Sequence, residues 1–139
     1  MQLRMESDPI AVRKGLVTLL ACPMMRGLDD GARGTAEIVL AEVLNNIVEH
    51  AYADLAGEIC VSLQPQSGGV FVEICDQGRA FPHEELPHGT LPQFDSHNGL
   101  PEGGFGWFLI RKLVQGLTYN RKEACNHLSF LLPAEPTAH

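Results

Sequence analysis

The sequence has no apolar run long enough to cross a membrane. Its longest apolar stretch, near residues 15–25, is interrupted by Thr18 and Pro23, whereas a membrane-spanning helix needs about 20 apolar residues. Residues 1–6 also lack the apolar centre of a signal peptide. We therefore expect a cytoplasmic protein without a membrane partner.

Positive charge is scarce in this chain. It has 10 Lys and Arg residues against 17 Asp and Glu residues, and its formal net charge is −7. Contacts with nucleic-acid phosphates need clustered Lys and Arg side chains. Because no such cluster is present, we expect no direct binding to nucleic acid.

Paired cysteine motifs are missing too. No two cysteines form a C-x-x-C pair and no export signal is present, so the expected state is a buried, reduced thiol rather than a disulfide or a metal ligand. The cysteines are Cys22, Cys60, Cys75 and Cys125.

The remaining composition is that of one globular domain. The chain has 139 residues, 45% of them hydrophobic, and it shows no internal repeat. We expect a single domain over residues 1–139, with a flexible tail over 134–139.

Local patterns predict an alternation of helices and strands. Ser7 or Asp8 before Pro9 indicates a helix start, and Ile10 and Val17 are expected in the buried stripe of that helix. A polar connection is expected over 27–34. The other expected elements are a strand around 3–5, a helix from 34 or 35 to 52, a hairpin over 58–64 and 70–76, a helix after 103–106, and strands over 117–122 and 127–132.

The longest helical pattern carries a polar stripe. Glu42, Asn46 and His50 are spaced four residues apart, so their side chains form one tilted row on a helix. Such a row can be a hydrated surface, and taken alone that is the simpler interpretation. It can also form one wall of a metal and phosphate site.

A second polar signal ends the hairpin. Asp76 lies an even number of residues from Val70, Val72 and Ile74 along the strand. Its carboxylate is therefore expected to point to the same face as these side chains, toward the helix layer. A buried carboxylate needs a hydrogen-bond donor. The donor is either a turn backbone or the amine of a ligand.

A long stretch without periodicity follows. Residues 82–102 contain four prolines and no Lys or Arg, which is typical of a lid or a binding loop. The stretch runs into Gly103-Gly104-Phe105-Gly106 and then an apolar helix. Backbone amides at such a helix start can approach an anion closely.

In this order the motifs resemble those of the GHKL ATPase superfamily, and within it the serine-kinase anti-sigma factors of bacterial partner-switching modules. The resemblance covers nearly the whole chain. It matches Glu42–Asn46 with His50–Tyr52 to the N box, Asp76–Gly78 to the first glycine box, Gly103–Ile110 to the second, and Asn126–Phe130 to the closing strand.

The resemblance implies a Bergerat-type ATP-binding fold. This is an α+β two-layer sandwich in which a mixed, mostly antiparallel sheet carries helices on one face. It also implies ATP and Mg²⁺ as cofactors, a general base at Glu42 and a Mg²⁺ ligand at Asn46. Asp76 would accept the adenine amino hydrogen, and Gly78 would let the base lie close to the backbone.

Other residues follow from the same resemblance. Gly104 and Gly106 would donate amides to the phosphates, residues 82–103 would form the lid, and Ser129 would hold a water beside the adenine. Further expected nucleotide contacts are His50, Ala80, Phe81, Gly103, Phe105 and Trp107. Ala80 stands where many members have a second glycine, and Phe105 where a basic residue is common.

The function that the resemblance implies is an anti-sigma factor with ATP-dependent protein serine kinase activity. Its substrate would be a small anti-anti-sigma partner of the STAS type, its other partner a sigma factor, and a homodimer through the first strand is an open expectation. Since no Lys or Arg lies between Ala80 and Ile110, the alternative is a nucleotide-dependent binding module with little kinase activity. The catalytic piece of a sensor histidine kinase ranks last, because the chain has no room for a dimerisation helix pair.

Overall fold

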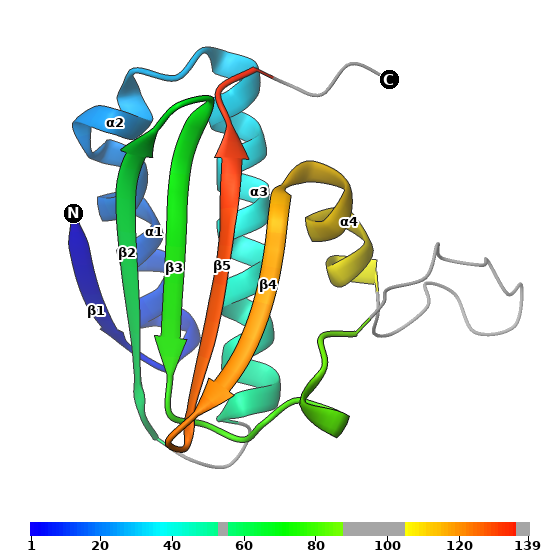
Figure 1. Ribbon diagram of the computed structural model, residues 1–139. Coiled ribbons are helices and arrows are strands. Elements are labelled where there is room, and N and C mark those ends of the chain that lie inside the picture. The colour runs from blue at the N-terminus through cyan, green and yellow to red at the C-terminus, as the bar shows by residue number, and fades with distance from the viewer. Residues whose placement is uncertain (53–55, 88–104, 136–139) are drawn as a thin grey trace, which may run out of the picture.

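The computed structural model describes residues 1–52, 56–87 and 105–135. It has two layers, a five-stranded sheet and a layer of helices packed on one of its faces (Figure 1). The strands are β1 (Gln2–Glu6), β2 (Glu58–Gln66), β3 (Gly69–Asp76), β4 (Gln115–Lys122) and β5 (Cys125–Pro133). The helices are α1 (Pro9–Ala21), α2 (Pro23–Arg26), α3 (Asp30–Asn46) and α4 (Phe105–Leu113), with a π-helical turn η1 (Ile47–Ala51) and a 3-10 turn η2 (Pro82–Glu84).

The sheet has the strand order β1-β2-β3-β5-β4, and every pairing among these strands is antiparallel. The expected α+β two-layer fold is confirmed. A mixed, mostly antiparallel sheet was expected, and the described strands form a sheet that is antiparallel at every pairing. β1 lies at one edge, and β2, β3 and β5 occupy the centre.

Alternation along the central strands builds the core. The inward-facing residues are almost fully buried against the helices, which is the pattern of a sheet covered on one face. They are Ile59, Val61 and Leu63 on β2, Val70, Val72 and Ile74 on β3, and Leu128, Phe130 and Leu132 on β5.

Helix α1 begins where its sequence predicted but buries a different face. The side chain of Asp8 accepts a hydrogen bond from the Ala11 amide and caps the helix. Ile10 and Val17 are 69% and 66% exposed, so the prediction that they join the buried stripe was wrong. The buried face centres on Val12 and Leu19, which lie about 200° around the helix from Ile10 and Val17.

Helix α3 starts earlier than expected. The Asp29 side chain accepts a 2.7 Å hydrogen bond from the Ala32 amide, and this cap places the helix start at Asp30 rather than at residue 34 or 35. The second half of the predicted polar connection over 27–34 is therefore helical. At its other end α3 widens into the π-helical turn η1, and the Tyr52 amide donates to the Ile47 carbonyl at 3.2 Å.

The cysteines divide into two groups. All four are free thiols, but only Cys22 is buried as expected. The other three are half-buried on strands of the sheet, so the prediction of burial was wrong for them. Among the helices that the structure describes, none is long and apolar enough to span a membrane.

Candidate nucleotide site

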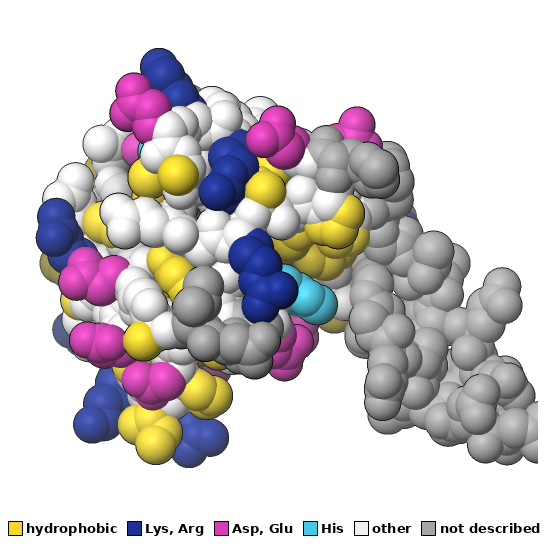
Figure 2. Space-filling view, turned by 90° about the horizontal axis from the view of Figure 1, so that it is seen from below, with side chains coloured by type: hydrophobic (Ala, Val, Ile, Leu, Met, Phe, Trp, Pro, Cys, Tyr) yellow, Lys and Arg dark blue, Asp and Glu magenta, His cyan; other side chains and the backbone are white. Residues whose placement is uncertain are grey.

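A cavity of about 370 Å³ opens where the end of α3, the segment after β3 and the start of α4 meet. Its size is within the range of small-molecule sites. Its walls include five residues that the sequence placed at the nucleotide, Asn46, His50, Ala80, Phe81 and Trp107, and further Ala51, Arg79, Pro82 and Pro87. Figure 2 looks at the molecule from below and shows basic, acidic and hydrophobic side chains interspersed beside the residues that are not described.

Helix α4 approaches helix α3 tightly at Gly106. A Cβ atom added to Gly106 would lie 2.5 Å from Oε2 of Glu42 and 3.2 Å from Nδ2 of Asn46. Real Cβ atoms do not approach other atoms so closely, so only glycine fits at this position without displacing Glu42. The structure thus brings the predicted general base, the predicted metal ligand and the second glycine motif together.

The amide of Asn46 has a fixed orientation. Its Nδ2 donates a 2.8 Å hydrogen bond to the backbone carbonyl of Glu42, one turn earlier in α3. Because a carbonyl only accepts hydrogen bonds, the nitrogen must face it, and the remaining polar atom of the side chain is Oδ1. An amide oxygen is a hard ligand of the kind that Mg²⁺ prefers.

The residues present fit a metal that is held jointly with a ligand. Among the described residues, no group of three or more His, Cys, Asp or Glu side chains is placed to hold a metal ion. Mg²⁺ commonly takes one or two protein ligands and completes its shell with phosphate oxygens and water. A single ligand at Asn46 is consistent with that arrangement.

Asp76 is buried, as its parity predicted, with 5% of its surface exposed. Its Oδ1 accepts hydrogen bonds from the Gly78 amide at 2.9 Å and from Nδ2 of Asn126 at 2.8 Å. Burial raises the pKa of this carboxyl above its ordinary value, and the two hydrogen bonds and the nearby charges of Arg121 and His127 oppose that rise. The turn backbone thus supplies one of the donors that the carboxylate needs.

Asn126 is a hydrogen-bond partner of Asp76 that was not predicted from the sequence. It is 2% exposed and lies opposite Asp76 in the β3–β5 register. Its Nδ2 also donates to the Arg79 carbonyl at 2.9 Å, and its Oδ1 accepts from Tyr119 Oη at 2.6 Å and from Arg121 Nη1 at 2.9 Å. The sequence did contain a signal for this role. Asn126 is a polar residue that lies an even number of positions from the apolar residues Leu128 and Phe130 on the last strand, and so faces inward with them.

The prediction for Ser129 was wrong. Ser129 lies three positions beyond Asn126 and therefore faces the open side of the sheet, where its Oγ is 2.6 Å from Oγ1 of Thr118. Successive residues of a strand point to opposite faces, so a residue at this parity cannot reach a cavity on the helix side. Asn126, at the inward parity of the same strand, is the β5 residue that contacts Asp76.

Gly78 serves backbone packing. An added Cβ would collide with the carbonyl oxygen of Ala51, the last residue of η1. This close approach lets the Arg79 amide donate to that carbonyl at 2.9 Å. The segment after β3 is thereby attached to the end of η1, and the contact of Gly78 with a base stays a prediction.

Three aromatic rings pack together beside the cavity, and two of them, Phe81 and Trp107, line it. Phe81 packs edge to face against Trp107, with ring centroids 5.5 Å apart, and against Tyr119, with centroids 5.2 Å apart. Trp107 is 2% exposed, and within the described residues its Nε1 has no hydrogen-bond partner. These rings fix the position of the first turn of α4 relative to residues 79–82.

Parts of the predicted site lie outside the described residues. Gly103 and Gly104 are among them, as is most of the predicted lid over 82–103. Phe105 is the first residue of α4. The described start of the lid segment is held by Arg111, whose Nε donates to the Pro87 carbonyl at 3.0 Å and whose Nη2 donates to the Leu86 carbonyl at 3.3 Å.

The chain is similar to known proteins over most of its length. The profile of the histidine kinase-like ATPase domain family matches residues 5–132. The serine-protein kinase RsbW of Oceanobacillus iheyensis is 27% identical over 124 residues, which cover 87% of this chain and 78% of that protein. The serine/threonine-protein kinase BtrW of Bordetella bronchiseptica is 31% identical over 106 residues, 75% of this chain and 72% of that protein.

A solved structure gives independent support for the fold. The histidine kinase domain of the blue-light activated histidine kinase of Erythrobacter litoralis aligns with 90% of this chain at a TM-score of 0.55 and 20% identity, and the alignment spans 60% of that chain. At this identity the likeness concerns the fold alone. Taken together with the family match over residues 5–132, these similarities establish that the chain belongs to the histidine kinase-like ATPase domain family.

Proposed function

We propose that this protein is an ATP-dependent protein serine kinase that also acts as an anti-sigma factor. The observation that carries the proposal is the meeting of Glu42, Asn46 and Gly106, of which Asn46 lines the cavity. Its relatives are named as a serine-protein kinase and a serine/threonine-protein kinase, which supports the same activity. The substrate would be a serine of a small anti-anti-sigma protein of the STAS type, and the site of action the cytoplasm.

Each residue of the junction has a chemical role in this proposal. Glu42 would take the proton of the attacking serine hydroxyl as a general base. Asn46 would hold Mg²⁺ through Oδ1, and the first amides of α4 would face phosphate oxygens at the positive end of the helix. Bound ATP with Mg²⁺ would supply the phosphoryl group.

The base-recognition end of the site would be formed by Asp76 and Asn126. Both are buried, and Asn126 holds Asp76, Arg79 and Tyr119 in one hydrogen-bonded network. A carboxylate in such a network keeps its orientation before a ligand arrives, which reduces the ordering cost of binding. Recognition of the adenine amino group is thus assigned to Asp76.

The decisive experiment is phosphate transfer by Glu42→Ala. A partner is captured from the native cell by affinity purification, and transfer from labelled ATP is compared for the wild type, Glu42→Ala and Glu37→Ala. Loss of a general base lowers the rate by roughly 10²–10⁴-fold. Glu37 is an exposed residue of the same helix, so Glu37→Ala should match the wild type. Equal transfer by Glu42→Ala would remove Glu42 from the role of base.

A second function deserves a test because of one sequence feature. The stretch from Ala80 to Ile110 has no Lys or Arg, whereas kinases usually place cations near the transferred phosphoryl group. A module that binds its partner with nucleotide as a structural ligand would need none. Calorimetric binding of ATP together with an unphosphorylated co-purified partner would favour this second function.

A further inference from the structure

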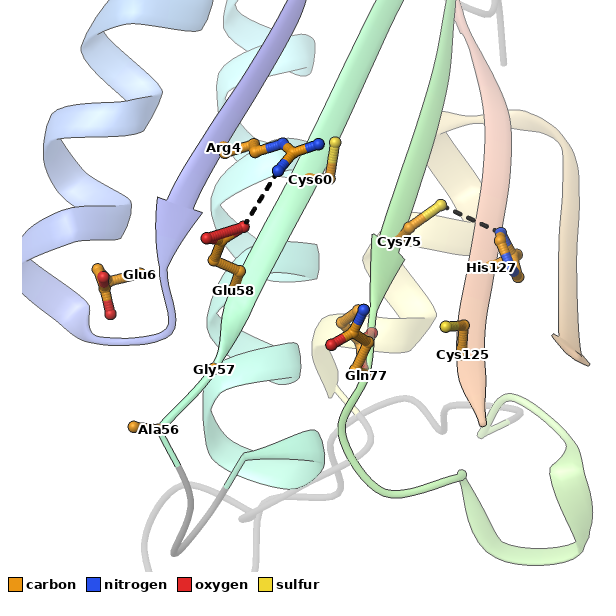
Figure 3. A pocket seen from close by; sticks show the side chains of 11 residues that line it. Arg4, Glu6, Ala56, Gly57, Glu58, Cys60, Cys75, Gln77, Cys125 and His127 are labelled. Atoms are coloured by element: carbon orange, nitrogen blue, oxygen red, sulfur yellow. Dashed lines mark hydrogen bonds and ion pairs between the residues drawn. The ribbon is translucent and has the colours of Figure 1, made fainter. Parts of the chain in front are cut away.

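The open face of the sheet carries a thiol cluster that the proposed kinase chemistry does not use. A hollow of about 550 Å³ lies on this face, away from the cavity near α4. Cys60, Cys75, Cys125 and His127 line it, together with the Arg4–Glu58 ion pair at its rim (Figure 3). The cluster comes from three neighbouring strands.

The register of the sheet places two of the thiols side by side. Cys60 on β2 is the direct partner of Cys75 on β3, and Cys75 is the direct partner of His127 on β5. Core packing does not explain these cysteines, since both are only half-buried and neither belongs to the hydrophobic core that includes Cys22.

The spacing of directly paired residues suits a disulfide. Directly opposed residues of antiparallel strands have Cα atoms about 4.5–5.5 Å apart. A disulfide spans a Cα separation of about 4.4–6.8 Å. Cys60 and Cys75 can therefore be joined by rotation of their side chains with little movement of the backbone.

Cys125 is placed less favourably for the same bond. The β3–β5 register ends at the Asp76–Asn126 pair, so Cys125 lies one position past the last paired residue and diagonal to Cys75. Diagonal neighbours on adjacent strands are about 7–8 Å apart, beyond the usual span of a disulfide.

His127 gives the pair a proton acceptor. Sγ of Cys75 lies 3.1 Å from Nδ1 of His127, and Figure 3 shows this contact on the open side of the sheet. Burial raises the pKa of the Cys75 thiol, as do the neighbouring groups Cys60, Glu73, Cys125 and Asp76. The Cys75 thiol is thus held protonated next to a base, which suits the second step of a disulfide-forming reaction better than the first.

We propose that Cys60 and Cys75 are a redox site at which a hydroperoxide forms a disulfide between β2 and β3. With hydrogen peroxide as the oxidant, the Cys60 sulfur attacks one peroxide oxygen, and its S–O bond forms as the O–O bond breaks. The thiol proton passes to the departing hydroxide, so the products are a sulfenic acid and water. The Cys75 sulfur then attacks the Cys60 sulfur and its proton passes to Nδ1 of His127. The S–O bond breaks, and the departing hydroxide takes that proton from His127 and leaves as a second water. The two thiols lose two electrons in total, and hydrogen peroxide is reduced to two waters.

Peptide mass spectrometry of the full chain tests the proposal. The reduced protein is treated with hydrogen peroxide, remaining thiols are alkylated, and linked peptides are sought without and with dithiothreitol. The expected result is a Cys60–Cys75 linked peptide that disappears on reduction. Cys60→Ser and Cys75→Ser should each abolish it, while Cys125→Ser and Cys22→Ser should keep it, with circular dichroism confirming that each variant is folded.

His127→Gln supplies a second measurement. It removes the ring nitrogen beside Cys75 and leaves both thiols in place, so disulfide formation should be slowed at least several-fold. The proposal is overturned if the wild type yields only separate sulfinic or sulfonic acids, or if the linked peptide joins Cys125 in place of Cys60.

Discussion

Gly106 leaves no room for a side chain at the meeting point of α3 and α4. In Gly106→Ala the new Cβ would press on Oε2 of Glu42 at 2.5 Å. Because this atom is the end of a flexible side chain, we expect the fold to survive and the carboxylate to be displaced. A displacement of about 1 Å can cost on the order of 10²-fold in rate. Steady-state transfer from labelled ATP measures the loss.

Gly34→Ala is the matched control for that variant. An added Cβ at Gly34, inside α3, meets nothing within 4 Å. Activity should therefore be unchanged, while the free energy of unfolding should rise by roughly 0.5–1 kcal/mol, because alanine is the better helix residue. Unchanged transfer in Gly106→Ala would show that the position of Glu42 does not limit the reaction.

The burial of Asp76 should make the free energy of unfolding depend on pH. Burial raises the pKa of Asp76 above its ordinary value of 3.8, so the folded state binds this proton more tightly than the unfolded state does. The stability gained from the proton is complete below the unfolded-state pKa and is lost as pH rises through the folded-state pKa. At neutral pH the buried charge therefore destabilises the fold.

Asp76→Asn tests this sign. Its amide oxygen can still accept from the Gly78 amide and from Nδ2 of Asn126, while no charge is buried. We expect the variant to be at least as stable as the wild type at neutral pH, and its advantage to shrink as the pH is lowered toward 4. Urea unfolding across that pH range gives the comparison. A variant less stable by more than about 1 kcal/mol at neutral pH would contradict it.

Among the elements, η1 is tied to the sheet by one hydroxyl. Tyr52 follows η1, and its Oη donates to the Glu58 carbonyl at 2.9 Å and accepts from the Gln77 amide at 2.7 Å. It thus joins the end of η1 to the start of β2 and the end of β3. Tyr52→Phe would leave the Gln77 amide without its partner, and we expect a loss of roughly 1–3 kcal/mol in urea unfolding.

Thr18→Ala provides the comparison for this hydroxyl deletion. The Thr18 hydroxyl donates to the Lys14 carbonyl at 3.3 Å on an exposed face of α1. Exposed groups exchange such bonds with water, so the change should stay within about 0.5 kcal/mol. If both deletions cost the same, Tyr52 does not connect these elements energetically.

Element type could be predicted from the sequence better than element ends or faces. Period-2 alternation located β2 and β3, because every second residue is buried along β3 and along the first six residues of β2. The start of α3 was missed because Gly31 and Gly34 resemble a loop, while the deciding interaction is a single cap at Asp29. The buried face of α1 depends on its packing against β1 and α3, which no local pattern contains.

The candidate site residues also divide into those that local patterns could place and those that depend on tertiary packing. Glu42, Asn46 and Asp76 could be placed because helix spacing and strand parity fix where side chains point. Ser129 was assigned to the wrong face because a short motif does not fix the register of the last strand. The pairing of Asn126 with Asp76 is a tertiary fact, and so is the exclusion of any side chain at Gly106.

At the scale of the whole molecule, Mg²⁺ and ATP should stabilise the folded chain jointly. A ligand that binds only the folded state at 100 times its Kd adds about 2.7 kcal/mol, which for a domain of this size raises Tm by on the order of 10 °C. Thermal unfolding followed by circular dichroism measures the shift. The full shift should require both components, since the described residues offer Mg²⁺ no cage of their own.

Asn46→Ala separates metal from nucleotide in this experiment. Removal of the Asn46 amide deletes the proposed protein ligand, so the part of the Tm shift that disappears with a chelator in the wild type should be absent in the variant. Nucleotide alone should still give its smaller shift, because the residues assigned to base recognition, Asp76 and Asn126, are unchanged. A variant that retains the full chelator-sensitive shift would place Mg²⁺ on the phosphates alone. The role of α3 would then be reduced to Glu42.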